Sequence, residues 1–267
     1  MKKYISFFKI RFFCGLQYRL VMFSALTTQV FWGLLEVLAF LALWKSEPSG
    51  FPMDFSSVIT YVWLKESLFA LINTWAADDD TAAIFVNGGI AYEMCRPVSM
   101  YSMWFSRAMA GRLSEAALRC VPVLTVAILL PAPYGICFAK SIPAFFLFLL
   151  SMLLGLFVVL SFCILVYMLC FFTISPKGWR MVLTGAVELL SGSVIPLPFF
   201  PDNVRRVLDI LPFASIHNVP FLIYTGELQG FAVLEKMLLQ VFGIVVLVSL
   251  GELICSRAKR RVVVQGG

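Results

Sequence analysis

Long runs of apolar residues alternate with short polar stretches along this chain. A membrane-spanning helix needs about 20 predominantly apolar residues, and runs of roughly this length recur throughout the sequence. The predicted fold class is therefore an all-α integral membrane protein, with a single transmembrane domain over residues 1–267. We expect six spanning helices, at Leu20–Trp44, Val58–Ala77, Arg107–Leu130, Ile142–Phe172, Met181–Ile195 and Phe231–Cys255.

The composition agrees with this pattern. Hydrophobic residues make up 61% and charged residues 13% of the chain, with a mean hydropathy of +0.92, whereas about a quarter of the residues of a soluble domain are charged. The formal net charge of +6 reflects basic residues near the ends of the spans, so we expect no nucleic-acid partner. The seven cysteines form no CxxC pair, which favours apolar packing over metal ligation or disulfides.

The basic residues predict the orientation, because Lys and Arg accumulate in short cytoplasmic connections. Both termini are then cytoplasmic. The basic residues on the cytoplasmic side are Lys2, Lys3, Lys9, Arg11, Arg19, Arg96, Arg107, Arg112, Lys177, Arg180, Arg257, Lys259, Arg260 and Arg261. Those on the outer side are Lys45, Lys140, Arg205, Arg206 and Lys236.

Residues 1–18 are expected to form an interfacial helix before the first span. Ile5, Phe8, Phe12 and Leu16 recur at helical spacing, and the basic residues among them can meet anionic lipid headgroups. A disordered basic leader is the alternative.

The fifth apolar segment is interrupted by three prolines, Pro196, Pro198 and Pro201. Each lacks an N–H and clashes with the preceding turn, so we expect the helix, which would otherwise run to Ile195, to stop or fold back there. Asp202 and Asn203 can cap a following amphipathic helix that ends near Leu211 and lies in the membrane interface.

The connection after the second span, residues 77–101, is the longest predicted cytoplasmic loop. Asp78, Asp79 and Asp80 suit a helix N-terminus, where carboxylates accept unpaired N–H groups. Gly88 and Gly89 would then break or end that helix. An acidic triplet can also be ordinary solvated surface. The position of the loop on the cytoplasmic side, and not its charge, therefore favours a role in docking another subunit.

Few charged residues fall inside the predicted spans: Glu36, Lys65, Glu66, Arg119 and Glu188. Burying one costs about 3 kcal/mol on insertion scales, so each is expected to face another helix, a cavity or the interface. Lys65 and Glu66 are adjacent and point about 100° apart, so we expect them not to pair with each other. Lys65 is expected to meet Glu36 or Glu188 instead. Such a pair would belong to a polar path or a dimer contact, or it would be a structural link between helices.

Motifs for chemistry are missing from the sequence. It contains no GxxxxGK[ST] phosphate-binding loop, so we expect this chain to bind no cofactor and to have no enzyme activity of its own. Any process that needs energy from ATP would then depend on another subunit. His217 is the one histidine, without an HExxH or GxSxG motif, and is expected to be a hydrogen-bonding loop residue.

Two stretches resemble the permeases of type-2 ABC transporters. The first is the pattern of Ser191-Gly192, Pro196 and Phe199-Phe200-Pro201, followed by LPF and YTGE. The second is GGIAYEMCRPVS after the second span, where Met94 or Cys95 stands near the usual leucine and Pro97 matches the family proline. The resemblance is to the short form without a large extracellular domain.

This resemblance implies the subunit composition and the location. Two ATPase subunits, which bind ATP and Mg²⁺, dock below two permeases, and the second permease is identical or different. The protein is expected in the cell membrane, the bacterial inner or plasma membrane, in contact with lipid. Its cargo is expected to be hydrophobic or amphipathic, such as a drug, a peptide or a lipid-linked molecule.

Two regions carry the expected site residues. The coupling loop to the ATPase is expected to use Asp78, Asp79, Asp80, Gly88, Gly89, Arg96 and Pro97. The outer gate lies in the re-entrant region 189–230 and is expected to use Ser191, Gly192, Pro196, Leu197, Pro198, Phe199 and Phe200. Small residues before the prolines permit close helix approach, and the apolar tip would plug the exit.

Two other functions stay open at this point. One is a membrane anchor or regulatory subunit for an ATPase that transports nothing. The other is an ATP-independent carrier or channel, although the two halves of the chain show no convincing inverted repeat.

The predicted topology can be tested by cysteine labelling with a membrane-impermeant reagent. A probe introduced at Asn203 should be labelled from outside, and one at Lys259 should be labelled only after the membrane is opened. The reverse pattern would contradict the orientation.

Overall fold

The computed structural model describes residues 2–17, 19–74, 81, 84, 89–172 and 176–259, and within these ranges it contains helices and no strand. The predicted all-helical fold is therefore confirmed for this part of the chain. The α-helices are α1 (Lys2–Gly15), α2 (Arg19–Ser46), α3 (Phe55–Ile72), α5 (Ile90–Met94), α6 (Met100–Leu129), α7 (Ile142–Leu169), α8 (Pro176–Leu190), α9 (Asp202–Leu208), α10 (Ala214–Thr225) and α11 (Phe231–Lys259). The 3₁₀ turns are η1 (Pro48–Gly50), η2 (Cys170–Phe172) and η3 (Leu197–Phe199).

Local capping explains several helix ends. The Ser99 hydroxyl accepts from Ser102 N at 3.4 Å, so α6 begins seven residues before the predicted span at Arg107. The Ser141 hydroxyl accepts from Ala144 N at 3.2 Å at the start of α7. Gly226, in the left-handed conformation with φ 79°, ends α10.

Four described helices are long and apolar enough to span a membrane: Phe23–Ser46, Phe55–Ile72, Ile142–Phe172 and Phe231–Lys259. The predicted spans Arg107–Leu130 and Met181–Ile195 are not among these four helices. Of the two helices in question, α6 carries several charged residues, and α8 has 15 residues and ends at Leu190. The structure therefore agrees with a multi-pass membrane protein, and the count of six spans stays a prediction.

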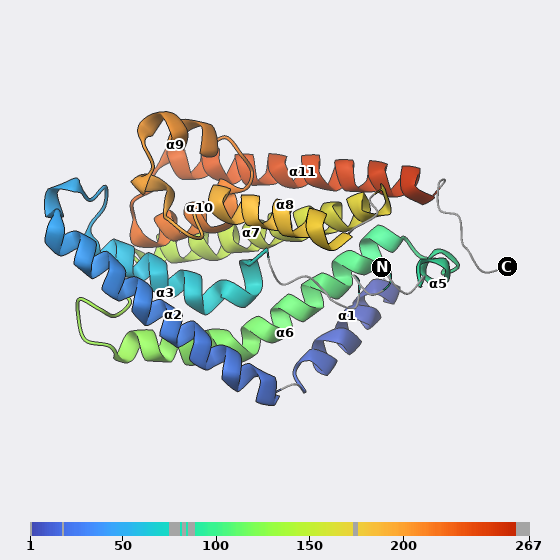
Figure 1. Cartoon of the computed structure of the whole chain (residues 1–267), viewed down its shortest axis with the longest axis horizontal. Helices are drawn as coiled ribbons and strands as arrows, with labels where there is room; N and C mark the ends of the chain where they lie inside the picture. The colour runs from blue at the N-terminus through green and yellow to red at the C-terminus, as the bar shows by residue number, and fades with distance from the viewer. Residues whose placement is uncertain are drawn as a thin grey trace.

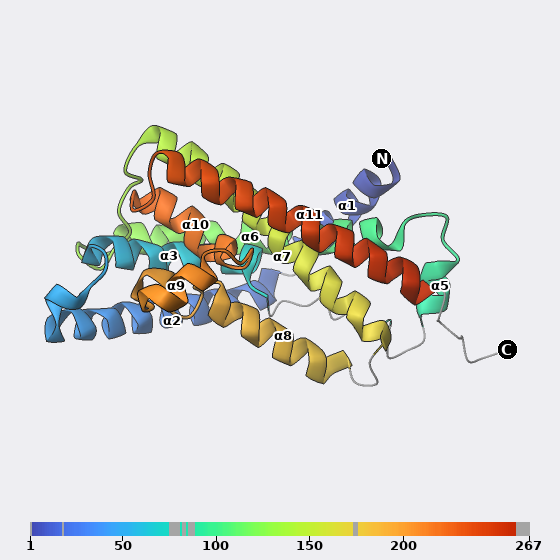
Figure 2. The ribbon, with the colours of Figure 1, turned by 90° about the horizontal axis from the view of Figure 1, so that it is seen from above.

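Helix α7 forms the centre of the bundle. It packs mainly against α11 and α10, and α3 packs against α6 beside it. Figure 2 shows α11 crossing over α7. A Cβ atom on Gly155 of α7 would lie 3.2 Å from Ser215 O and 3.1 Å from Ile216 O of α10, so the glycine permits close contact between the helices. Gln240 of α11 links the same region, because its Nε2 donates to Ser215 O at 2.8 Å and to Ser151 O at 3.1 Å.

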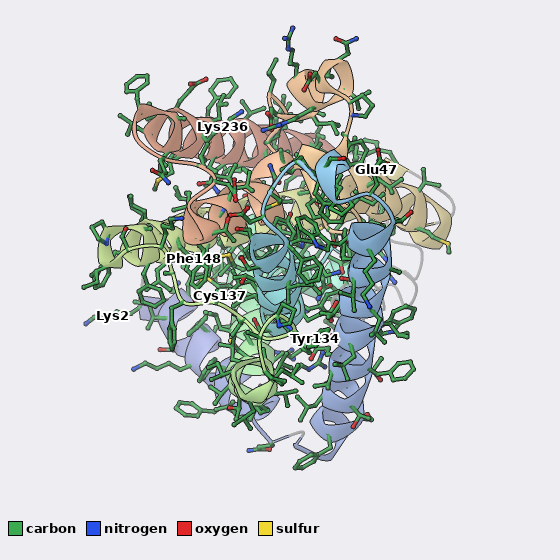
Figure 3. All side chains as sticks on the ribbon, turned by 90° about the vertical axis from the view of Figure 1, so that its left-hand side faces the viewer. Lys2, Glu47, Tyr134, Cys137, Phe148 and Lys236 are labelled. Carbon is green, nitrogen blue, oxygen red and sulfur yellow. The ribbon has the colours of Figure 1, made fainter. Side chains whose placement is uncertain are left out.

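The connections gather at two ends of the bundle. At the first, which we call the α5 end, α5 lies with the N-terminus of the chain and the last turns of α11 (Figure 1). At the opposite α9 end, α9 lies with the connection between α2 and α3 (Figure 1). Figure 3 looks onto the α9 end, where the connection before α7 is held on α3: Trp63 Nε1 donates to Tyr134 O at 2.8 Å and Cys137 N donates to Thr60 Oγ1 at 3.0 Å.

Helix α1 lies along α6. Tyr4 accepts a hydrogen bond from Ser99 N at 3.0 Å, and the Arg107 guanidinium lies 5.8 Å from the centre of the Phe7 ring. Ile5, expected on the apolar face, is 53% exposed and points away from the protein. Helix α1 covers most of the predicted residues 1–18, and its position at a membrane surface stays a prediction.

All seven cysteines are free thiols in the structure. Burial is uneven among them, however: Cys163, Cys170 and Cys255 are buried, Cys120 is partly buried, and Cys14, Cys95 and Cys137 are exposed.

The contact between α7 and α10 can be tested at Gly155. Gly155→Leu should destabilise the protein by about 1–3 kcal/mol, because the side chain would force the two helices apart. Gly111→Leu is a matched control, since a Cβ atom there meets nothing within 4 Å. Thermal unfolding of the purified variants should show a lower Tm for Gly155→Leu alone, and equal values would contradict the close contact.

Candidate functional site

The chain between α8 and α10, residues 191–213, is the broken segment of the bundle. Helix α8 ends at Leu190, and Gly192 follows in the left-handed conformation with φ 80°. The predicted cause of the break is therefore wrong: a left-handed glycine ends the helix before the first proline is reached. Tyr61 of α3 donates its hydroxyl to Gly192 O at 2.9 Å, which pairs the carbonyl exposed by the break.

The predicted gate residues lie against the body of their own chain. Ser191, Gly192, Pro196 and Leu197 are buried, and Pro198, Phe199 and Phe200 are half-buried. Leu197 packs in a cluster with Leu208 and Ala214. The Phe199 ring lies 5.5 Å from the ring of Phe40 and 5.3 Å from that of Phe51. The apolar tip is thus held on α2 and on the connection between α2 and α3.

The amphipathic helix predicted after the prolines is shorter than expected. Helix α9 runs from Asp202 to Leu208, its N-cap is Pro201, and no side chain caps it, so the predicted capping by Asp202 and Asn203 is wrong. Lys236 of α11 lies 3.7 Å from the Asp209 carboxylate and donates to Asp209 O at 3.3 Å, which holds the end of α9 on α11.

His217 lies in α10 and is fully buried, so the expectation of a hydrogen-bonding loop residue is wrong. Both of its ring nitrogens are without hydrogen-bond partners among the described residues, as is Asn218 Oδ1. Burial lowers the pKa of His217 to about 4, so the imidazole is neutral at pH 7, although the Glu188 carboxylate opposes the shift. No group of three His, Cys, Asp or Glu side chains in the described part of the chain is placed to hold a metal ion.

Lys65 of α3 pairs with Glu36 of α2, one of its two predicted partners. Its Nζ also lies 3.4 Å from Glu66 Oε1, so the expectation that these neighbours do not pair is wrong. The long, flexible side chain of Lys65 allows its Nζ to contact both carboxylates. Gln29 of α2 donates to Glu66 O at 3.2 Å, which adds a second link between the two helices.

Glu188, the other predicted partner of Lys65, is bonded to the end of α3 instead. Thr74 donates to Glu188 Oε1 from its backbone N at 2.9 Å and from its hydroxyl at 2.7 Å. Arg112 of α6 donates to Leu71 O at 3.1 Å and to Asn73 O at 2.6 Å, carbonyls that the end of α3 leaves unpaired. Arg119, the remaining charge, lies 3.7 Å from Glu115 on its own helix.

A small pocket lies beside this contact. It is lined by Thr74, Cys163, Val166, Tyr167, Arg180 and Thr184. The sequence does not predict the hydrogen bonds that Tyr61, Thr74 and Arg112 make to the ends of α3 and α8. A tyrosine or threonine in an apolar run carries no signal of its partner.

The predicted coupling loop is only partly described. Asp78, Asp79, Asp80 and Gly88 lie outside the described residues. Gly89 begins the turn into α5, whose Glu93 is buried, accepts from Trp104 Nε1 at 3.4 Å and lies 3.4 Å from Arg96 Nη1. Arg96 and Pro97 are exposed at the α5 end.

Tyr92 is the most exposed aromatic side chain of this loop among those described, at 79%. Sequence reasoning did not single it out. With Met94, Arg96 and Pro97 it forms an exposed surface of mixed apolar and basic character, which we call the α5 surface.

Comparison with known proteins identifies the chain at family level. A family model described as ABC-2 family transporter protein matches residues 80–266, which include α5, α8 and the broken segment. No curated protein matches the chain. Because the family match covers most of the sequence, the chain belongs to the ABC-2 transporter family, in which it is a membrane permease subunit.

Proposed function

We propose that this permease forms half of the translocation pathway of an ATP-driven exporter. It pairs with a second permease, identical or different, and two ATPase subunits bind ATP and Mg²⁺ and dock on its cytoplasmic side. The exported substrate is hydrophobic or amphipathic, such as a drug, a peptide or a lipid-linked molecule. In this proposal the chain spans the membrane six times, with α6 and α8 as the third and fifth spans and both termini in the cytoplasm.

The observation that carries the proposal is the separation of two specialised regions. The α5 surface lies at the end of the bundle that holds the N-terminus, and the broken segment lies toward the opposite end (Figure 1). A transporter driven by a separate ATPase needs a docking region on one side and a movable closure on the other.

The α5 surface has the character of a docking site. It combines an exposed tyrosine with an exposed arginine on a short helix, and both residue types are enriched at interface hot spots. The buried Glu93 holds this helix on Trp104 of α6, so force applied at α5 reaches a spanning helix directly.

The broken segment has the character of an outer gate. Its aromatic side chain Phe199 rests on two other aromatic rings, and such contacts are each worth about 0.5–1.5 kcal/mol. Contacts of this size can form and break during a transport cycle, which requires only a few kcal/mol between the states.

The docking role can be tested by co-purification of the permease with its partner ATPase. Tyr92→Ala should reduce the amount of bound ATPase by about tenfold, corresponding to about 1.4 kcal/mol of a hot-spot contact. Phe138→Ala is the matched control, since Phe138 is 91% exposed in the connection between α6 and α7. Full ATPase retention by Tyr92→Ala would remove α5 from the docking site, and wild-type protein that never binds an ATPase would favour an independent carrier.

The gate role can be tested by labelling a cysteine at Leu197, which is fully buried. In the Leu197→Cys protein, adding Phe199→Ala should speed labelling by an external maleimide about fivefold, because about 1 kcal/mol of ring packing is lost. Adding Phe146→Ala instead should leave the rate unchanged, since Phe146 is an exposed residue of α7. Equal rates in the two double variants would show that Phe199 does not hold the segment closed.

A further inference from the structure

The end of α3 is fastened to α8 by a buried carboxylate. Thr74 lies two residues after the end of α3 and is the last described residue before position 81. Its backbone N and its hydroxyl both donate to Glu188 Oε1, at 2.9 Å and 2.7 Å. Thr74 is 1% exposed and Glu188 is 5% exposed, so water does not compete for these bonds.

Two donors converge on one oxygen of Glu188, and each can use one of the two lone pairs of that oxygen. No basic side chain among the described residues forms an ion pair with Glu188, and the hydrogen bonds from Thr74 are what link it to the end of α3.

Glu188 also lies next to the break in α8. The Ser191 hydroxyl donates to Glu188 O at 3.1 Å, and the left-handed Gly192 follows at once. Gly192 O is in turn held by the hydroxyl of Tyr61. The short stretch from Glu188 to Gly192 is therefore hydrogen-bonded at both of its ends. Thr74, after the end of α3, bonds Glu188, and Tyr61 of α3 bonds Gly192.

This arrangement joins the two regions of the proposed function. Thr74 leads into the loop that carries the α5 surface, and Gly192 leads into the broken segment. A displacement of the loop pulls on Thr74, and the hydrogen bonds pass that displacement to α8 within two residues of its end.

We propose that Glu188 is a positioning residue that transmits movement of the cytoplasmic loop to the outer gate through its bonds to Thr74. This inference rests on the proposed function, because an ATPase must move the loop. A contact that merely stabilised the bundle would hold α3 and α8 together in every state, and its loss would lower stability and activity alike. A transmitting contact can be lost while ATP hydrolysis continues.

The test uses the complex with its ATPase in membranes, with Leu197→Cys as the probe in a background where Cys14, Cys95 and Cys137 are replaced by serine. Two quantities are measured: the rate of ATP hydrolysis, and the change in external labelling of the probe when ATP is added. Glu188→Met removes the acceptor at similar size, Thr74→Val removes only the hydroxyl, and Thr74→Ser restores it.

Glu188→Met should keep hydrolysis within about twofold of the wild type while its ATP-dependent change in labelling falls at least about fivefold, the lower range of coupling between sites. Thr74→Val should show an intermediate loss, and Thr74→Ser should recover the wild-type response. Gln240→Met is the matched control, because Gln240 is a buried side chain that bonds α7 and α10 away from this contact. It should lower thermal stability and keep the response.

An unchanged response in Glu188→Met would overturn the inference. An equal loss in Gln240→Met would also overturn it, since general loosening of the bundle would then explain both. A wild-type complex without any ATP-dependent change would overturn the proposed function itself, and this inference with it.

Discussion

The break in the chain at Gly192 imposes the main physical constraint on this structure. In apolar surroundings every exposed backbone N–H and C=O costs several kcal/mol unless it finds a partner, so a helix can be interrupted there only where other side chains supply the bonds. Tyr61 supplies one at Gly192 O, and Lys236 supplies one at Asp209 O. The partners come from α3 and α11, and these helices are therefore held on either side of the broken segment.

The same constraint explains why α7 and α10 are so close. Helix α10 is buried from Ala214 to Tyr224. Another helix can approach it closely only where the facing residue is a glycine. Gly155 of α7 is that residue, and Ser151 one turn earlier shares hydrogen bonds with Gln240. Small and polar residues thus carry the packing in the centre of the bundle, as is usual where lipid removes the hydrophobic drive between helices.

The sequence predicted the architecture better than the details. The predicted boundaries at Ile142 and Phe231 match the starts of α7 and α11, because long apolar runs have few other solutions in a membrane protein. The start of α6 was placed too late, because its first turns combine polar and aromatic residues and a serine cap. The end of α8 was assigned to prolines, whereas the left-handed Gly192 comes first and does not depend on them.

Pairing between distant residues could be predicted only in part. Lys65 had two candidate partners, and the choice of Glu36 over Glu188 depends on how α2 packs on α3, which a single sequence does not specify. The bonds from Thr74 to Glu188 involve a common residue type at the end of a span, where composition gives no warning. The position of His217 after LPFASI predicts a loop, yet α10 begins at Ala214 and accommodates Pro220 in its interior.

In the proposed mechanism, the broken segment is packed closed at rest and is released when ATP binds. Hydrogen–deuterium exchange of the complex measures this most directly, because the hydrogen-bonded amides of the segment, at Phe199, Phe200, Arg205 and Asp209, exchange only when those bonds open. The account predicts slow exchange there without nucleotide, and faster exchange when ATP is bound and its hydrolysis is blocked. Exchange in this segment that is fast without nucleotide, or that ATP does not change, would contradict it.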